Sequence, residues 1–326
     1  MENYIVSARK YRPNTWESVV GQGTITSTLQ NAIASEKLAQ AYLFCGPRGV
    51  GKTTCARLFA QSINKGEAEK DADLSYNVFE LDAASNNKVD DIRNLIEQVR
   101  IPPQIGTYKV YIIDEVHMLS TGAFNAFLKT LEEPPKHAIF ILATTEKHKV
   151  LPTILSRCQI YDFNRISVGD MAKHLAEIAK KEKIKTEERA LHVIAEKADG
   201  ALRDALSMFD QLASFSDGNL TYDVVIKNLH ILDYDYYFKL VDCFLNQDIP
   251  NALLSFDEIL SNGFDGHHFV LGLSSHFRNL MVSKDPNTLK LMDVSKEVKA
   301  KYQEQSAKTE MIFILECLEI LSDADN

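Results

Sequence analysis

A glycine-rich stretch near residue 50 has the residue types and the spacing that hold phosphate groups in proteins. It has the form GxxxxGK[ST], follows an apolar run and precedes a helical pattern. Its glycines let backbone N–H groups approach phosphate oxygens, and the helix directs unsatisfied amides at the same charge. We expect Lys52 to reach the β- and γ-phosphates of ATP, and Thr53 to contact Mg²⁺. The residues expected to contact the nucleotide here are Gly46, Pro47, Arg48, Gly49, Val50, Gly51, Lys52, Thr53 and Thr54.

Two carboxylates follow a second apolar run. Residues 110–113 are apolar or aromatic and lead directly into Asp114 and Glu115. We expect Asp114 to orient the Mg²⁺ shell and Glu115 to polarise the attacking water, because phosphoryl transfer depends on positioning and electrostatics. Alone, an acidic pair of this kind is more often a solvated strand end. After an intact phosphate loop, it predicts ATP hydrolysis.

A pair of threonines ends a third apolar run, residues 139–143. Thr144 and Thr145 would lie at the carboxyl edge of a parallel sheet, beside the expected nucleotide. Either hydroxyl could orient the water, and we take Thr144 as the catalytic candidate. The alternative is a threonine pair that only ends a β-branched strand.

The segment from Asp114 to His117 also spells the DExH pattern of nucleic-acid helicases. One short α/β region followed by a long helical region leaves no room for the second motor domain of a helicase. The sequence therefore disfavours a helicase, and we expect His117 to have a structural role.

Short apolar runs alternate with helical patterns in the first half of the chain. The helical patterns place apolar residues where helices would cover the faces of a buried sheet. This alternation predicts an α/β domain with a largely parallel, five-stranded sheet. The expected strands are residues 41–45, 78–81, 109–114, 138–145 and 159–163, and the expected helices are residues 52–63, 89–99 and 123–131.

From about residue 167 the strand pattern ends, and amphipathic helical patterns continue to the end of the chain. The second half is therefore predicted to be all-helical. Its first expected helices are residues 171–182, 186–198 and 201–215. We place domain boundaries near residues 166 and 230, which gives domains of residues 1–166, 167–230 and 231–326.

The composition limits the possible partners. A net charge of -9 over 326 residues argues against a surface that coats nucleic acid. Any DNA contact is expected to be local, and the turn at residues 85–88 is a candidate.

The sequence has neither a membrane-spanning apolar run nor a signal-peptide pattern, which predicts a cytoplasmic protein without a membrane partner. The five cysteines are scattered, so neither a disulfide framework nor a clustered metal site is expected.

Together, these segments resemble the clamp-loader clade of AAA+ proteins, in particular its bacterial gamma/tau subunits. The resemblance rests on the phosphate loop, then DEVH, then ATT at residues 143–145, LSRC at residues 155–158 and GALRDA at residues 200–205. Other similar segments are residues 8–13, 19–22, 81–85 and 128–135. Beyond residue 230, only the helical character and the length are similar.

The resemblance implies roles that spacing alone does not show. Arg157 would be an arginine finger in trans, which enters the ATP site of a neighbouring subunit and offsets the charge that develops on transfer. Arg203 would sense the γ-phosphate from the helical lid of its own subunit. The residues implied to line the nucleoside pocket are Arg9, Tyr11, Arg12, Pro13, Val19 and Val20.

The resemblance also implies a fold and a function. The fold would be a Rossmann-like AAA+ ATPase domain, a small three-helix lid, and a helical collar through which subunits assemble. The chain would hydrolyse ATP as a motor subunit in a hetero-oligomeric ring with other clamp-loader subunits, and would load a sliding clamp onto primed DNA. No polymerase active site is expected, although such subunits belong to a DNA-directed DNA polymerase. The alternatives are a non-hydrolysing scaffold subunit and a Holliday-junction branch-migration motor.

Two features depart from the family pattern. Family members usually carry a four-cysteine zinc module after the phosphate-loop helix, but residues 65–73 occupy that place without a cysteine. Because structural zinc needs four N or S ligands, we predict no zinc site and a solvated connection. The sequence ends at Asn326, so the polymerase and helicase contacts of a longer C-terminal tail are not expected.

Overall fold

The computed structural model describes residues 5–64, 74–229, 234–261, 263–292, 294 and 296–325. The chain forms two compact units. One consists of Met1–Ile178 with Ala195–Asp210, and the other of Ala179–Ile194 with Gln211–Asn326. The five-stranded sheet and the phosphate loop belong to the first unit.

The first unit is built on a parallel sheet in the strand order β2-β3-β4-β1-β5. Its strands are β1 (Ala41–Cys45), β2 (Val78–Asp82), β3 (Lys109–Asp114), β4 (Ala138–Thr144) and β5 (Gln159–Asp162). Every residue of β1 and β4 is buried, as expected for central parallel strands that are covered on both faces. The five predicted strands are confirmed, and their ends agree with the prediction to within one residue.

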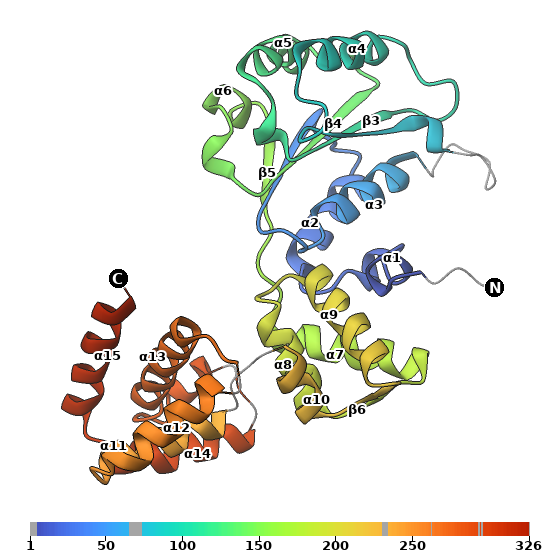
Figure 1. Ribbon diagram of the computed structural model, residues 1–326. Helices are drawn as coiled ribbons and strands as arrows, with labels where there is room; N and C mark the ends of the chain where they lie inside the picture. Colours follow the sequence, from blue (N-terminus) through green and yellow to red (C-terminus); the bar gives the residue numbers. More distant parts are fainter. Residues whose placement is uncertain are drawn as a thin grey trace. The chain divides into compact units, whose positions relative to one another are not determined.

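Helices cover both faces of this sheet (Figure 1). One face carries α4 (Val89–Val99) and α5 (Thr121–Glu132), and the other carries α2 (Gly23–Ala34) and α3 (Lys52–Asn64). Phe127 packs edge-on against Phe140 on the first face, and Phe59 packs edge-on against Tyr42 on the second. These contacts bury large apolar side chains on both sides, which fixes the strands and the loops at their ends.

Short helical turns lie in the loops of the first unit, and four of them carry or adjoin predicted site residues. Arg9 lies in α1, and Val19 directly follows η1. Glu115 immediately precedes η3, and Arg157 follows α6. The short elements are α1 (Ser7–Lys10), η1 (Trp16–Ser18), η2 (Leu74–Asn77), η3 (Val116–Met118), η4 (Lys147–Lys149) and α6 (Pro152–Leu155).

The range predicted to form a lid contains helices and, against expectation, two short strands. The helices are α7 (Val168–Glu182), α8 (Glu188–Lys197), α9 (Leu202–Phe215) and α10 (Tyr222–Asn228). β6 (Lys185–Thr186) pairs in parallel with β7 (Asn219–Leu220), so the prediction of an all-helical second half is wrong there. Two-residue strands leave no alternating pattern to detect. Within the described part of this range, α10 adds a fourth helix to the three predicted, and the boundaries at residues 166 and 230 stay predictions.

The C-terminal region is helical and has its own core. Its elements are α11 (Tyr234–Leu245), α12 (Ile249–Ser261), α13 (Gly266–Val282), η5 (Thr288–Leu291), α14 (Lys296–Lys308) and α15 (Met311–Asp325). Phe238, Phe277 and Tyr302 meet in one buried cluster. His276 lies among them, with Gln305 and the Tyr302 hydroxyl as partners of its ring nitrogens, and burial lowers the pKa of His276 to about 4. No helix in the described part of the chain is long and apolar enough to cross a membrane.

Two buried tyrosines differ in whether their hydroxyl groups form hydrogen bonds. The Tyr111 hydroxyl has no hydrogen-bond partner among the described residues, whereas the Tyr42 hydroxyl accepts the N–H of Ala39 at 2.8 Å. We expect Tyr111→Phe to keep or raise the free energy of unfolding, by up to about 1 kcal/mol. Tyr42→Phe should lower it by about 1–2 kcal/mol, because Ala39 loses its acceptor. Urea denaturation measures both, and equal losses would contradict this expectation.

Candidate nucleotide site

The glycine-rich loop between β1 and α3 has a backbone that glycine adopts without strain. Gly46, Gly49 and Gly51 have φ values of 144°, 76° and 103°. A Cβ atom at Gly46 would lie 2.4 Å from the carbonyl oxygen of Phe163. The loop can therefore turn tightly into the first turn of α3, which is the arrangement in which backbone N–H groups bind phosphate.

Lys52 begins α3, and only 6% of it is exposed. Its Nζ donates to the carbonyl oxygens of Gly46 and Pro47, both at 2.7 Å. Burial lowers the pKa of Lys52, and the carboxylates of Glu115 and Asp114 oppose this shift. The ammonium group is thus held against the phosphate loop, where it can meet an anion that binds there.

Thr53 and Asp114 lie in direct contact. The Thr53 hydroxyl donates to Asp114 Oδ2 at 2.8 Å, and Asp114 Oδ1 accepts the N–H of Glu115 at 3.0 Å. A hydroxyl and a carboxylate supply the oxygen ligands that suit Mg²⁺, which also keeps waters and binds phosphate. In the described ranges, no cluster of three or more His, Cys, Asp or Glu side chains could hold a metal ion. Residues 65–73, where we predicted no zinc, lie outside the described residues.

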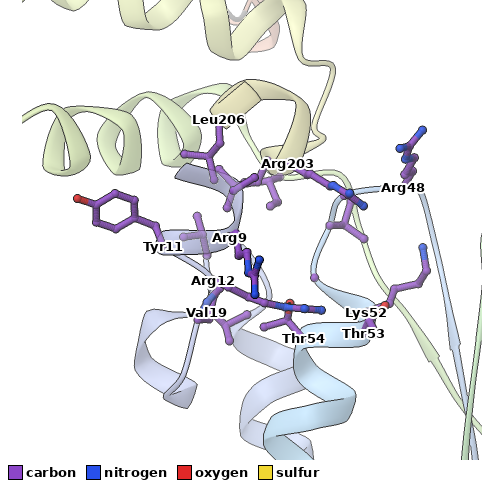
Figure 2. Close-up of a pocket in the computed structure, with 18 of the residues that line it drawn as sticks. Arg9, Tyr11, Arg12, Val19, Arg48, Lys52, Thr53, Thr54, Arg203 and Leu206 are labelled. Atoms are coloured by element: carbon purple, nitrogen blue, oxygen red, sulfur yellow. The ribbon is translucent and has the colours of Figure 1, made fainter. Parts of the chain in front are cut away.

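A cavity of about 660 Å³ extends from the phosphate loop to α1 and α9 (Figure 2). The predicted site residues that line it are Arg9, Tyr11, Arg12, Pro13, Val19, Val20, Arg48, Gly49, Val50, Gly51, Lys52, Thr53, Thr54, Asp114, Glu115 and Arg203. The sequence did not predict Val6, Ala8, Arg57, Ile166, Leu202 and Leu206, which also line it. The remaining predicted residues, Gly46, Pro47, Thr144 and Arg157, lie outside this lining.

Positive charge dominates the cavity wall. Among the described residues that line it, six are basic and two, Asp114 and Glu115, are acidic. Figure 2 shows Arg12 reaching toward Thr54, and its Nε donates to the Thr54 hydroxyl at 3.3 Å. Burial and the nearby Arg57 lower the pKa of Arg12. An excess of cations around a phosphate loop favours a polyanionic ligand such as a nucleoside triphosphate.

A pair of hydrogen bonds joins α1 to α9 on one side of the cavity. The backbone N–H and the hydroxyl of Ser7 donate to the two carboxylate oxygens of Asp210, at 2.6 and 2.5 Å. α1 carries Arg9, and α9 carries Arg203, so this contact holds two basic residues over one cavity. Asp210 is not predictable from the sequence, because nothing in its local pattern marks it as a partner of a distant serine.

The residues around Glu115 differ from expectation in one respect. Glu115 has a left-handed backbone, with φ 48°, and its Oε2 accepts the hydroxyl of Thr145 at 3.1 Å. The Thr144 hydroxyl is instead buried, where it accepts the N–H of Glu146 at 3.0 Å and lies 2.9 Å from His117 Nδ1. The structure therefore places Thr145, rather than Thr144, beside Glu115, and the role of Thr144 stays a prediction.

Arg157 lies outside the cavity of its own chain. Its guanidinium pairs with Glu132 at 2.7 Å and donates to the carbonyl oxygen of Thr153 at 2.6 Å. A third of the side chain is exposed, which leaves the guanidinium accessible to another molecule.

Residues 21–167 match a family model described as "DNA polymerase III, delta subunit", and residues 170–218 match one described as "DNA polymerase III clamp loader subunit, ATPase lid domain". The DNA polymerase III subunit gamma of Buchnera aphidicola subsp. Baizongia pistaciae is 36% identical over 89% of this chain and 82% of its own length. The chain belongs to the DNA polymerase III gamma/tau family. The subunit tau of Bacillus subtilis is 41% identical over 98% of this chain, which spans 59% of that longer protein.

The chain also shares its fold with solved structures. The Holliday junction branch migration motor RuvB of Thermotoga maritima aligns with a TM-score of 0.54 at 19% sequence identity, over 72% of this chain and 79% of that one. The likeness concerns the fold alone. It confirms the predicted class, an α/β domain with a five-stranded parallel sheet followed by helical regions.

The contact between Ser7 and Asp210 gives a testable prediction. Asp210→Asn replaces a charged acceptor of two hydrogen bonds, which should cost about 1–3 kcal/mol and loosen α1 against α9. We expect the affinity for ATP to fall about tenfold, as measured by calorimetric titration. Asp204→Asn is the control, since Asp204 is an exposed residue on the same helix. Wild-type affinity in Asp210→Asn would show that this contact does not shape the site.

Proposed function

We propose that this gamma/tau chain hydrolyses ATP as a motor subunit of the bacterial clamp loader, and that hydrolysis drives the loading of a sliding clamp onto primed DNA. One observation carries the proposal. Thr53 and Asp114 are in contact, with Lys52 and Glu115 as their sequence neighbours in one cationic cavity. Family membership supplies the clamp-loader context.

The residues divide the work of ATP binding and hydrolysis. Lys52 and the loop amides would bind the β- and γ-phosphates, and Thr53 and Asp114 would hold Mg²⁺. When bound, the ion supplies positive charge to the phosphate oxygens. Glu115 would orient a water and take up its proton, since its carboxylate lines the cavity beside this set.

Three further residues would complete the site. Arg203, which lines the cavity from α9, would sense the γ-phosphate in its own subunit. Arg157, which lies outside this cavity, would act in trans on a neighbouring subunit. Thr144 would support the water position through its contact with His117, and Thr145 is the nearer hydroxyl to Glu115.

The proposed partners are the other subunits of a hetero-oligomeric loader ring, the sliding clamp and primed DNA, in the cytoplasm. Residues 1–166 would form the motor, residues 167–230 the lid, and residues 231–326 the collar for assembly. A non-hydrolysing scaffold subunit fits less well, because the phosphate loop and the acidic pair are both intact. A branch-migration motor fits less well, because the family matches are to subunits of DNA polymerase III.

ATP turnover tests the proposal directly. We expect the loader ring containing this chain to hydrolyse ATP faster when clamp and primed DNA are both present. Glu115→Gln should bind ATP normally and lose turnover by on the order of 10² or more, because the amide cannot take up a proton. Glu177→Gln, an exposed site on α7, is the control. Absence of stimulation by clamp and DNA together would refute the proposed function.

Mixed rings test the trans role of Arg157. Rings with only Arg157→Ala subunits should bind ATP but not turn it over, and rings with only Lys52→Ala subunits should not bind it. When the two variants are mixed, an intact site can receive Arg157 from a Lys52→Ala neighbour. We therefore expect part of the turnover to return. No recovery in mixed rings, or full turnover with Arg157→Ala alone, would place Arg157 outside the reaction.

A further inference from the structure

His117 occupies a buried position directly behind the proposed catalytic carboxylate. It lies in η3, two residues after Glu115, and only 6% of its side chain is exposed. Glu115 has a left-handed backbone, with φ 48° and ψ 45°. This conformation is about 1–2 kcal/mol less stable than the right-handed one for residues other than glycine. This sharp turn packs η3 on β4, so the His117 ring meets the residues at the carboxyl end of that strand.

Each ring nitrogen of His117 has its own polar partner. Nε2 lies 3.1 Å from Oε2 of Glu146, and Nδ1 lies 2.9 Å from the Thr144 hydroxyl. Because an ionised carboxylate can only accept, Nε2 donates to Glu146, and Nδ1 of the neutral ring then accepts the Thr144 hydroxyl. The Thr144 oxygen in turn accepts the N–H of Glu146 at 3.0 Å. The arrangement gives every donor an acceptor and fixes the orientation of the ring.

The same ring touches Glu115. Nδ1 lies 3.4 Å from Glu115 Oε2, the oxygen that also accepts the Thr145 hydroxyl. Since Nδ1 of the neutral ring accepts from Thr144, the neutral ring acts on Glu115 by contact rather than by donation. The carboxylate is thus confined between the ring and Thr145. Among the described residues, the polar contacts of the Glu115 carboxylate fall on Oε2, which leaves Oε1 for a water.

Glu146 holds this arrangement from the opposite side. Its carboxylate also accepts from Lys149 Nζ at 2.8 Å, so it has a cation on one side and the imidazole on the other. Lys149 and Glu146 lie on the short segment after β4 that leads through η4. The orientation of the imidazole therefore depends on a carboxylate outside the cavity lining, which can be changed without touching the nucleotide.

We propose that His117 is a positioning residue for hydrolysis: oriented by Glu146 and Thr144, it confines the Glu115 carboxylate so that Oε1 faces the attacking water. The proposal rests on the proposed role of Glu115 as the group that activates this water. It differs from a purely structural role, in which loss of His117 would lower stability but leave the turnover of folded, ATP-saturated protein unchanged. A misplaced catalytic carboxylate instead lowers kcat and leaves nucleotide binding intact.

Two substitutions of His117 distinguish the contributions of its two ring nitrogens. Asparagine puts a polar group near the position of Nδ1 and loses the contact with Glu146, whereas glutamine can reach Glu146 and loses the ring that confines Glu115. We expect His117→Asn and His117→Gln each to lower kcat by about 10–100-fold in the assembled ring with clamp and primed DNA. The KM and the Kd for ATP should stay within about twofold of wild type.

Substitutions of Glu146 form the second part of the experiment, because they change the partner of His117 without altering a buried side chain. Glu146→Gln retains an acceptor for Nε2–H and should lower kcat by less than Glu146→Ala, which removes it. His148→Ala is the control, because the side chain of His148 is 76% exposed and its Nε2 lies 3.9 Å from Glu146 Oε1, beyond hydrogen-bond distance. It should leave kcat, KM and stability unchanged.

The outcomes are separable. Wild-type kcat in folded His117→Asn and His117→Gln, or equal kcat in Glu146→Gln and Glu146→Ala, would overturn the positioning role. If a His117 variant fails to fold, the Glu146 pair alone decides the question. Absence of ATP turnover in the wild-type ring would overturn the proposed function and this inference together. Turnover in wild type with no loss in the variants would overturn only this inference.

Discussion

The hydrogen bond from the Thr53 hydroxyl to the Asp114 carboxylate joins two segments that lie 61 residues apart in the chain. It forms because β1 and β3 run in the same direction, on either side of β4, so their carboxyl ends reach the same edge of the sheet. Lys52 precedes one partner, and Glu115 follows the other. If either strand were reversed, the lysine and the carboxylates would be separated by the length of a strand, roughly 17 Å.

Bringing these groups together has an electrostatic cost. Lys52 is almost fully buried, and burial and the nearby Arg57 both lower the pKa of Arg12. A lowered pKa means that the charged form of the side chain is less stable in the folded protein than in water. A polyanion in the cavity would stabilise these charged forms, so its binding free energy would add to the stability of the folded protein. The cationic wall thus links the binding of a polyanion to the stability of the fold around the cavity.

Local patterns made much of the first unit predictable. The apolar runs fixed the strands, because parallel strands covered on both faces must be apolar throughout. The phosphate loop was recognisable because its backbone needs positive φ angles, which glycine adopts without strain, so glycines recur there at fixed spacing. Asp210 was missed, because its partner Ser7 lies 203 residues away and no local pattern joins them. Thr144 and Thr145 could not be told apart, because successive strand residues point to opposite faces, and only packing decides which one meets Glu115.

Arg157 shows how the site and its assembly depend on each other under the proposed function. Its ion pair with Glu132 is partly exposed, and pairs of this kind contribute only about 0–1 kcal/mol. The guanidinium can therefore leave Glu132 for a γ-phosphate at small cost, since a phosphate offers more charge and several acceptor oxygens. Within its own subunit, the Ser7–Asp210 contact would hold the cavity wall in place. The contacts of His117 would keep the Glu115 carboxylate in position. The chain would then bind and orient ATP by itself but need a neighbour for fast hydrolysis, so that turnover would depend on the assembled ring.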